Sequence, residues 1–439
     1  MFVHGMTIRK SSNSATMIQL GKYSFGIGDR FEHQGEALLK AINKASEAGI
    51  HVIPVWNKSN REHHYVNTEP ISTRKEADAA VASLGWNAPY LVDADHINLS
   101  NVDRFIPFCD FYTIDVASWI DKPAPPESVD AFKQACGIFG TSISVPGLEV
   151  TVQVNNELIT RTADKYLSAV QEASRIYRHI EAVKGHGTFV AEISLDEVEV
   201  PQTPVDMLFI LKMIADLGIP IQTIAPKFTG RFNKGVDYIG DTEKFALEFE
   251  QHLLVIDYAV KNFGLPENLK LSVHSGSDKF TIYPVMVRLL RKHDKGIHLK
   301  TAGTTWLEEV IGLALSDGDA LMAVKEIYSI AYSRREELCA PYSDVIDITE
   351  AVLPSPDLVN GWTGSEFAGA LRHIQEHPDY NPDFRQLIHV AYKVAAEMGP
   401  RFLSLLKENR EVIGKCVEEN IWERHLQRLF LPLLKSVED

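Results

Sequence analysis

Three short segments of the sequence carry side chains that can exchange protons and bind metal ions. They are Asp93-Ala94-Asp95-His96, Asp196-Glu197 and His274-Ser275-Gly276-Ser277, and each lies at the end of an apolar run. Imidazole and carboxylate groups from separate segments suit Zn²⁺, Mn²⁺, Co²⁺ or Ni²⁺. We therefore expect a divalent-metal site that contains His96 and His274.

The same residues also have ordinary structural interpretations. An Asp at the start of a loop often caps the following helix, and a lone His at a strand end is often a hydrogen-bonded core residue. The period of a strand places Asp93 and Asp95 on one side and His96 on the other until the strand ends. Several acidic and imidazole groups at strand ends nevertheless favour a functional site.

Two carboxylates are candidates for proton transfer. Proton transfer on a substrate hydroxyl needs groups on opposite sides, so Glu197 is expected to act with Asp95 across the site. Glu192 lies five residues before Glu197, which puts it on the opposite face of a regular strand, and it is not expected to reach the site. The alternative for Glu197 is a surface position before Pro201.

A long polar segment, residues 227–241, follows another apolar run. Loops of this length inside a compact domain are usually functional. Lys227, Arg231 and Lys234 could hold a carboxylate or hydroxyl groups, with a solvated basic turn as the alternative. Asp237 or Asp241 could supply a carboxylate to the metal, although Asp241 is also placed to cap the next helix.

The elements that must position these residues are eight short apolar runs with helical segments between most of them. The predicted strands are 23–27, 51–56, 90–93, 111–116, 189–194, 221–226, 269–273 and 297–301. Repeated strand and helix units predict a parallel sheet, and no G-x-G-x-x-G follows the first strand to favour an open nucleotide-binding sheet. We expect a (β/α)₈ barrel, whose chemistry lies at the carboxyl ends of the strands.

The barrel is predicted to occupy residues 1–306, with a short β insertion near 137–161. Residues 307–439 are predicted to form a helical C-terminal extension, packed on the barrel or on a partner subunit in a homo-oligomer. Four cysteines without a CxxC pair predict neither disulfides nor a Cys-based zinc site.

The composition of the chain restricts the kinds of partner that it can bind. The 439 residues are 45% hydrophobic, and 44 Lys+Arg against 59 Asp+Glu give a net charge of −15. Without a basic patch, this charge disfavours nucleic acid and anionic membrane surfaces, so we expect a small-molecule partner. The sequence has neither a signal-peptide pattern nor a membrane-length apolar run, which predicts a cytoplasmic protein.

Two longer motifs carry a resemblance to a known family. The stretches KFTGRFNKGVDYIGD (227–241) and LSVHSGSDKF (271–280), with Asp95-His96 and Asp196-Glu197 upstream, resemble the tagaturonate epimerase (tagaturonate/fructuronate epimerase) family. The likeness extends through the barrel and the helical tail. It implies a divalent-metal-dependent enzyme that interconverts two keto-hexuronates in hexuronate catabolism.

The resemblance also implies roles for individual residues. Asp95 would be the proton acceptor and Glu197 the proton donor. The metal ligands would be His96, His274 and one carboxylate of Asp237 or Asp241.

The chemistry of such a reaction fits these residue types. The two sugar acids differ at a carbon two bonds from the ketone, so simple enolisation cannot invert it, whereas retro-aldol cleavage and recombination can. The alternatives are another metal-dependent barrel aldolase or ketose isomerase, or a non-catalytic sugar-acid-binding protein. Product analysis separates the enzymes, and a binding protein would need neither Asp95 nor Glu197.

Overall fold

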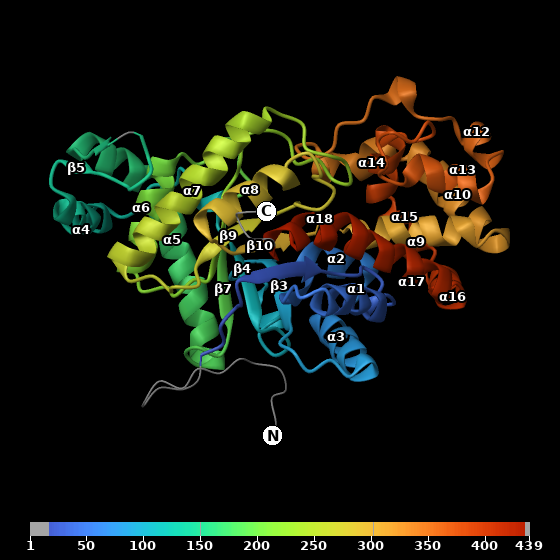
Figure 1. Cartoon of the computed structure of the whole chain (residues 1–439), viewed down its shortest axis with the longest axis horizontal. Coiled ribbons are helices and arrows are strands. Elements are labelled where there is room, and N and C mark those ends of the chain that lie inside the picture. Colours follow the sequence, from blue (N-terminus) through green and yellow to red (C-terminus); the bar gives the residue numbers. More distant parts are fainter. Residues whose placement is uncertain (1–16, 150, 302, 435–439) are drawn as a thin grey trace.

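A closed barrel of eight parallel strands forms the centre of the molecule (Figure 1). The computed structural model describes residues 17–149, 151–301 and 303–434. The strands are β1 Tyr23–Ile27, β2 Val52–Ser59, β3 Leu91–Ile97, β4 Phe111–Asp115, β7 Val190–Ser194, β8 Thr223–Ala225, β9 Lys270–Val273 and β10 Ile297–Lys300. Around the barrel they are ordered β1-β10-β9-β8-β7-β4-β3-β2, which confirms the predicted fold class.

Helices cover the outside of the barrel because their apolar faces pack on the strands. They are α1 Gly35–Glu47, α2 Asn60–Val66, α3 Pro70–Leu84, α5 Asn156–Lys184, α6 Pro204–Asp216, α7 Thr242–Phe263, α8 Tyr283–His293 and α9 Thr304–Leu315. No helix among the described residues is both long and apolar enough to cross a membrane.

The two ends of the barrel interior differ in polarity. A separate apolar cluster that includes Val55, Leu91, Phe111 and Val190 fills the amino-terminal end, where three of these residues begin their strands. Polar side chains occupy the inner faces farther along the strands. This division leaves chemistry to the carboxyl-terminal end, as in other barrels of this type.

An insertion lies between β4 and β7. It contains α4, Pro126–Ala135, and a pair of two-residue antiparallel strands, β5 Ser142–Ile143 and β6 Val152–Gln153. The β pair falls inside the segment predicted as an insertion, whereas α5 already begins at Asn156. In Figure 1, α4 and β5 lie at one end of the molecule, opposite the helical tail.

The C-terminal part of the chain is helical and shares a hydrophobic core with the barrel. Its helices are α10 Gly318–Ser333, α11 Arg335–Cys339, α12 Pro356–Asn360, α13 Gly364–Leu371, α14 Pro382–Val390, α15 Tyr392–Glu397, α16 Pro400–Glu408, α17 Arg410–Glu419 and α18 Gln427–Leu429. Helix α9 packs against α13 and α17 of this region. The predicted boundary after residue 306 therefore falls inside a helix that both parts share.

A buried ion-pair network joins the barrel to the tail. Asp278, in the loop after β9, accepts a hydrogen bond from Arg385 of α14 at 3.1 Å and lies 3.3 Å from Nδ1 of His373. Both side chains of the ion pair are fully buried. Although burial opposes ionisation, Arg385 and His373 hold the pKa of Asp278 well below its usual value. This network fixes the loop after β9 against α14.

Replacing Arg385 with Met is expected to lower the free energy of unfolding by about 3–5 kcal/mol, because it removes the guanidinium that is paired with the buried carboxylate of Asp278. Urea unfolding followed by circular dichroism measures the loss. Arg401→Met is the matched control, since Arg401 pairs with Glu326 at 2.7 Å on the surface and should cost about 0–1 kcal/mol. Equal, small losses in the two variants would contradict this assignment of the network.

Candidate active site

A cavity of about 1150 Å³ opens at the carboxyl ends of the strands. Each strand end contributes to its wall, through Arg30, Lys58, His96, Asp115, Asp196, Pro226, His274 and Thr301. Six of the predicted site residues line it, namely Asp95, His96, Glu197, Lys227, Arg231 and His274. The barrel therefore brings most of the predicted residues to one place.

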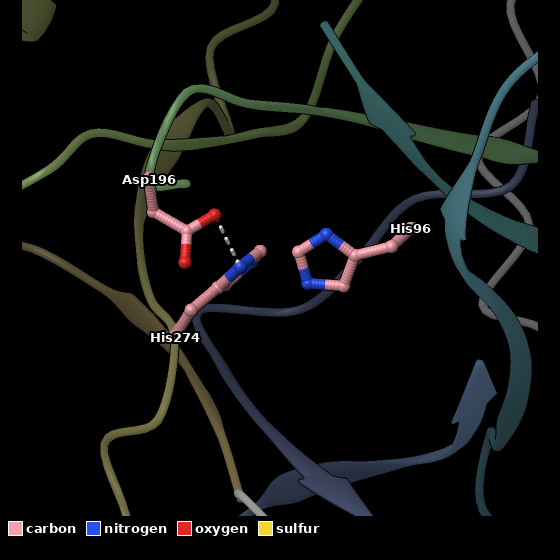
Figure 2. A group of neighbouring side chains, drawn as sticks. All are labelled: His96, Asp196 and His274. Carbon is pink, nitrogen blue, oxygen red and sulfur yellow. Dashed lines mark hydrogen bonds and ion pairs between the residues drawn. The ribbon is translucent and has the colours of Figure 1, made fainter. Parts of the chain in front are cut away.

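Two imidazoles and a carboxylate form a compact group in the cavity. The rings of His96 and His274 are neighbours, with centroids 5.3 Å apart and planes inclined at 76°, and Asp196 lies beside His274 (Figure 2). Nδ1 of His274 is 3.1 Å from Oδ1 of Asp196. One ligand atom from each of the three residues can be chosen so that all lie within 4.8 Å of one another.

A backbone irregularity brings His96 into this group. The register of β3 against β4 shifts between Ala94 and Ile97, and His96 has a positive φ of 52°. A bulge of this kind turns a side chain to a new direction and interrupts the alternation of the strand. Asp95 and His96 consequently both line the cavity, and strict alternation between them does not hold.

Further carboxylates orient the two imidazoles. Nε2 of His274 lies 2.7 Å from Glu192, and Nδ1 of His96 lies 3.2 Å from Asp115. The expectation that Glu192 cannot reach the site is wrong. Glu192 is completely buried on the inner face of β7, opposite Thr113 of β4. Because β7 ends at Ser194, strand alternation does not extend to Glu197, and the two residues need not lie on opposite faces.

Lys300 gathers the carboxylates at the floor of the cavity. Its Nζ lies 2.6 Å from Asp95, 2.7 Å from Asp93 and 3.4 Å from Glu192. It also donates a hydrogen bond of 2.5 Å to Thr113 Oγ1. The sequence places Lys300 at a strand end, but its role as the common partner of three carboxylates was not predicted. A charged residue at the end of a buried, apolar strand was the available signal.

The carboxylates around His96 and His274 favour a positive charge at this place. Burial would lower the pKa of His96, but Asp95 and other carboxylates raise it to about 10. Burial acts on His274 in the same way, yet Asp196 and Glu192 raise its pKa to about 9. The carboxylates thus stabilise a cation placed between the two rings.

Asp95 and Glu197 both lie beside His96. Oδ1 of Asp95 is 3.9 Å from Nε2 of His96, and Glu197 and Asp115 each have a carboxylate oxygen within 4.8 Å of a His96 nitrogen. Although burial acts in the opposite direction, Lys300 lowers the pKa of Asp95 to about 2. Asp95 is therefore ionised, and Glu197 is exposed to the cavity.

The two predicted substrate-binding cations occupy different surroundings. Lys227 follows β8 on the cavity wall, and its side chain forms no ion pair with another described residue. Arg231 lies at the rim, where its half-exposed guanidinium pairs with Asp347 at 2.5 Å. A carboxylate ligand would have to compete with Asp347 for Arg231.

Asp237 and Asp241, both described, lie outside the cavity wall. Asp237 accepts hydrogen bonds from the hydroxyl and backbone N–H of Thr281. Asp241 caps α7 by accepting from the backbone of Glu243 and Lys244. The carboxylate that the structure places beside His96 and His274 is Asp196.

A (β/α)₈ barrel with proton-exchanging and cation-stabilising groups at the carboxyl ends of its strands is the architecture of a barrel enzyme. The family model described as tagaturonate epimerase matches residues 7–429. The chain belongs to this family and is an epimerase.

Relatives and solved structures agree with the family. A tagaturonate/fructuronate epimerase of Thermotoga maritima is 26% identical over 423 residues, which cover 92% of this chain and 80% of the relative. The native crystal structure of the fructuronate-tagaturonate epimerase UxaE from Cohnella laeviribosi is 23% identical, with a TM-score of 0.77, and covers 93% of this chain and 81% of that chain. A glycerol complex of the same enzyme has a TM-score of 0.76 at 23% identity over the same shares of both chains. At this identity the solved structures bear on the fold alone.

Proposed function

We propose that this chain interconverts D-tagaturonate and D-fructuronate and needs a divalent metal ion to do so. The group of His96, His274 and Asp196, on the wall of a cavity of about 1150 Å³, carries the proposal. Membership of the tagaturonate epimerase family and similarity to the tagaturonate/fructuronate epimerase of Thermotoga maritima support this pair of substrates.

The residues present fit a divalent ion. Two imidazoles and one carboxylate within 4.8 Å of one another form a ligand set suited to Zn²⁺, Mn²⁺, Co²⁺ or Ni²⁺. The second carboxylate on His274, from Glu192, is the kind of partner that orients a metal-binding imidazole. When bound, the ion would supply Lewis-acid stabilisation of the negative charge that develops on the substrate ketone.

The reaction proceeds by cleavage and reformation of a carbon–carbon bond. The carbon that inverts is two bonds from the ketone carbon, so the carbonyl does not acidify its C–H bond. Removal of the proton from its hydroxyl group lets the bond toward the ketone half break, with the electron pair passing to that half. The resulting aldehyde turns and the bond reforms on its other face.

Asp95 and Glu197 move the proton in this scheme. Asp95 is ionised, because its carboxylate contacts Lys300 at 2.6 Å, and it accepts the hydroxyl proton. Glu197 returns a proton to the oxygen after the aldehyde has turned. Both lie beside His96, so they act at one reacting centre from different strands.

Metal-loaded protein incubated with D-tagaturonate in D₂O is expected to produce D-fructuronate without deuterium at the inverted carbon, because that C–H bond is never broken. NMR measures both the products and the label. Protein without added metal, treated with a chelator, is the control. Failure to form fructuronate under any of the four metals would reject the function. Fructuronate with deuterium at the inverted carbon would keep the function and reject the carbon–carbon cleavage.

A further inference from the structure

One cation in the cavity wall differs from most others in having no carboxylate partner. Four cations of the cavity wall form ion pairs with carboxylates: Lys300 with Asp93 and Asp95, Lys58 with Glu32, Arg30 with Glu62, and Arg231 with Asp347. Lys234 forms no ion pair with a described residue, and its Nζ donates to Ser275 Oγ at 3.1 Å. Ser275 directly follows His274, so this ammonium lies next to the proposed metal ligands.

The backbone around Lys234 is held from several directions. Lys279, which is fully buried, donates to the carbonyls of Asn233 and Val236 at 2.9 and 2.7 Å. The backbone N–H of Lys234 itself donates to the carbonyl of Val345 in the C-terminal region at 2.8 Å. The loop therefore presents the ammonium at a defined position.

The backbone of the next residue, Gly235, is also held in place. Gly235 has a φ of 74° and packs closely enough on Leu307 that an added Cβ would lie 3.2 Å from it. Its carbonyl accepts a hydrogen bond from the buried guanidinium of Arg385. The carbonyls on both sides of Lys234 are thus fixed by buried cations, which hold in place the backbone that carries the ammonium.

The surroundings of Lys234 favour an anionic ligand. Burial lowers the pKa of its ammonium, while Glu197 and Asp196 act in the opposite direction from farther away. A substrate carboxylate beside the Lys234 ammonium would stabilise its positive charge against this loss of solvation. Lys227 and Arg61 on the cavity wall also form no ion pair with a described residue, but among the described residues only Lys234 of these three donates a side-chain hydrogen bond to the loop that carries His274.

We propose that Lys234, with Ser275, binds the carboxylate of the substrate and retains the carboxylate-bearing half while it turns. The inference rests on the proposed function. Breaking the bond separates a three-carbon aldehyde acid from the ketone half, the bonding electrons pass to the ketone half, and the hydroxyl proton passes to Asp95. The aldehyde acid then has no covalent link to the site, so its carboxylate needs an anchor of its own.

A lysine suits this task better than an arginine. An ammonium is a point charge on a flexible stem, whereas a guanidinium fork fixes the plane of a carboxylate through two parallel hydrogen bonds. The fragment must turn to present its other face before the bond reforms. Lys234 can hold the charge through this rotation without fixing the orientation of the group.

The test uses metal-loaded full-length protein. Lys234→Gln is expected to lower kcat/KM for D-tagaturonate roughly 30- to 1000-fold, because it removes the charge partner of the carboxylate. It is also expected to increase the three-carbon aldehyde acid released per fructuronate formed, which NMR of the reaction mixture measures. Lys234→Arg should recover KM but lower kcat, since the fork restricts rotation. Lys244→Gln, an exposed residue on α7, is the matched charge control.

The outcomes separate this inference from the proposed function. If the wild type epimerises tagaturonate and Lys234→Gln keeps its kcat/KM and its level of fragment release, Lys234 is not the anchor and the function stands. A loss found only in Lys227→Gln would assign the anchor to that residue instead. Failure of the wild type to epimerise tagaturonate would overturn both. Circular dichroism and metal content identify a variant that has simply failed to fold, and Lys234→Arg then carries the test.

Discussion

Asp95→Asn and Glu197→Gln are each expected to lower kcat for epimerisation by roughly two to four powers of ten. Both substitutions keep the size of the side chain and most of its hydrogen bonds but remove its capacity to exchange a proton. For Asp95 the amide can still accept a hydrogen bond from Lys300, which contacts the carboxylate at 2.6 Å. Steady-state kinetics measures the loss.

Metal content and circular dichroism distinguish this effect from damage to the site. Neither Asp95 nor Glu197 belongs to the group of His96, His274 and Asp196, so metal content should stay at the wild-type level. Loss of metal in Glu197→Gln would instead assign the ion to the second group that could hold it, His96, Asp115 and Glu197. Asp103→Asn, which alters an exposed carboxylate paired with a surface histidine, should leave kcat unchanged. A variant at Asp95 or Glu197 with wild-type kcat would remove that residue from the proton-transfer pair.

The architecture of the barrel could be predicted because each strand is a short apolar run bounded by polar residues. The strand at 23–27 was predicted with its observed bounds, and the other seven differ by a few residues at their ends. The largest difference is at β3, which continues through Asp95 and His96 to Ile97. Charged residues ended the predicted strand there, but the interior of a barrel can hold them where they pair with one another.

The membership of the site was harder to predict. Strand alternation predicts that Glu192 points away from the site and that His96 faces the other side of its strand. Both predictions fail because a single sequence does not reveal the turn after Ser194 or the bulge in β3. Asp196 was recognised as a strand-end residue, but Asp237 and Asp241 were preferred as carboxylate ligands. Both of those residues instead satisfy backbone donors, at Thr281 and at the start of α7. Such choices depend on contacts between segments far apart in the chain.

The helical tail shows the same limit. Its helices were predicted from composition and period, but not its contacts with the loop that carries Lys234. Arg385 and Val345 belong to the tail, and both bind the backbone of this loop. The tail thus helps to build the cavity, and Arg231 also finds its partner there, in Asp347.

His274→Ala is expected to abolish metal binding and turnover together. His274 lies at the end of β9 and offers a ring nitrogen to the same space as His96 and Asp196. Its removal leaves one imidazole and one carboxylate, too few protein ligands for a stable site of this kind. Metal analysis after dialysis, with activity measured on the same samples, checks this. The fold should survive, because a residue at a strand end contributes little to the apolar core.

Three comparisons make the result specific to the metal. Chelator-treated wild type should be inactive and recover with Mn²⁺, Co²⁺, Ni²⁺ or Zn²⁺, whereas His274→Ala should not recover. Glu192→Gln keeps the three ligands but removes the charge that Glu192 places beside the His274 ring and Lys300, so metal affinity should fall by roughly 10- to 100-fold. His179→Ala, at an exposed histidine paired with Asp103, should behave as wild type. Full activity of the wild type at background metal content would show that the two imidazoles serve the reaction without a metal ion.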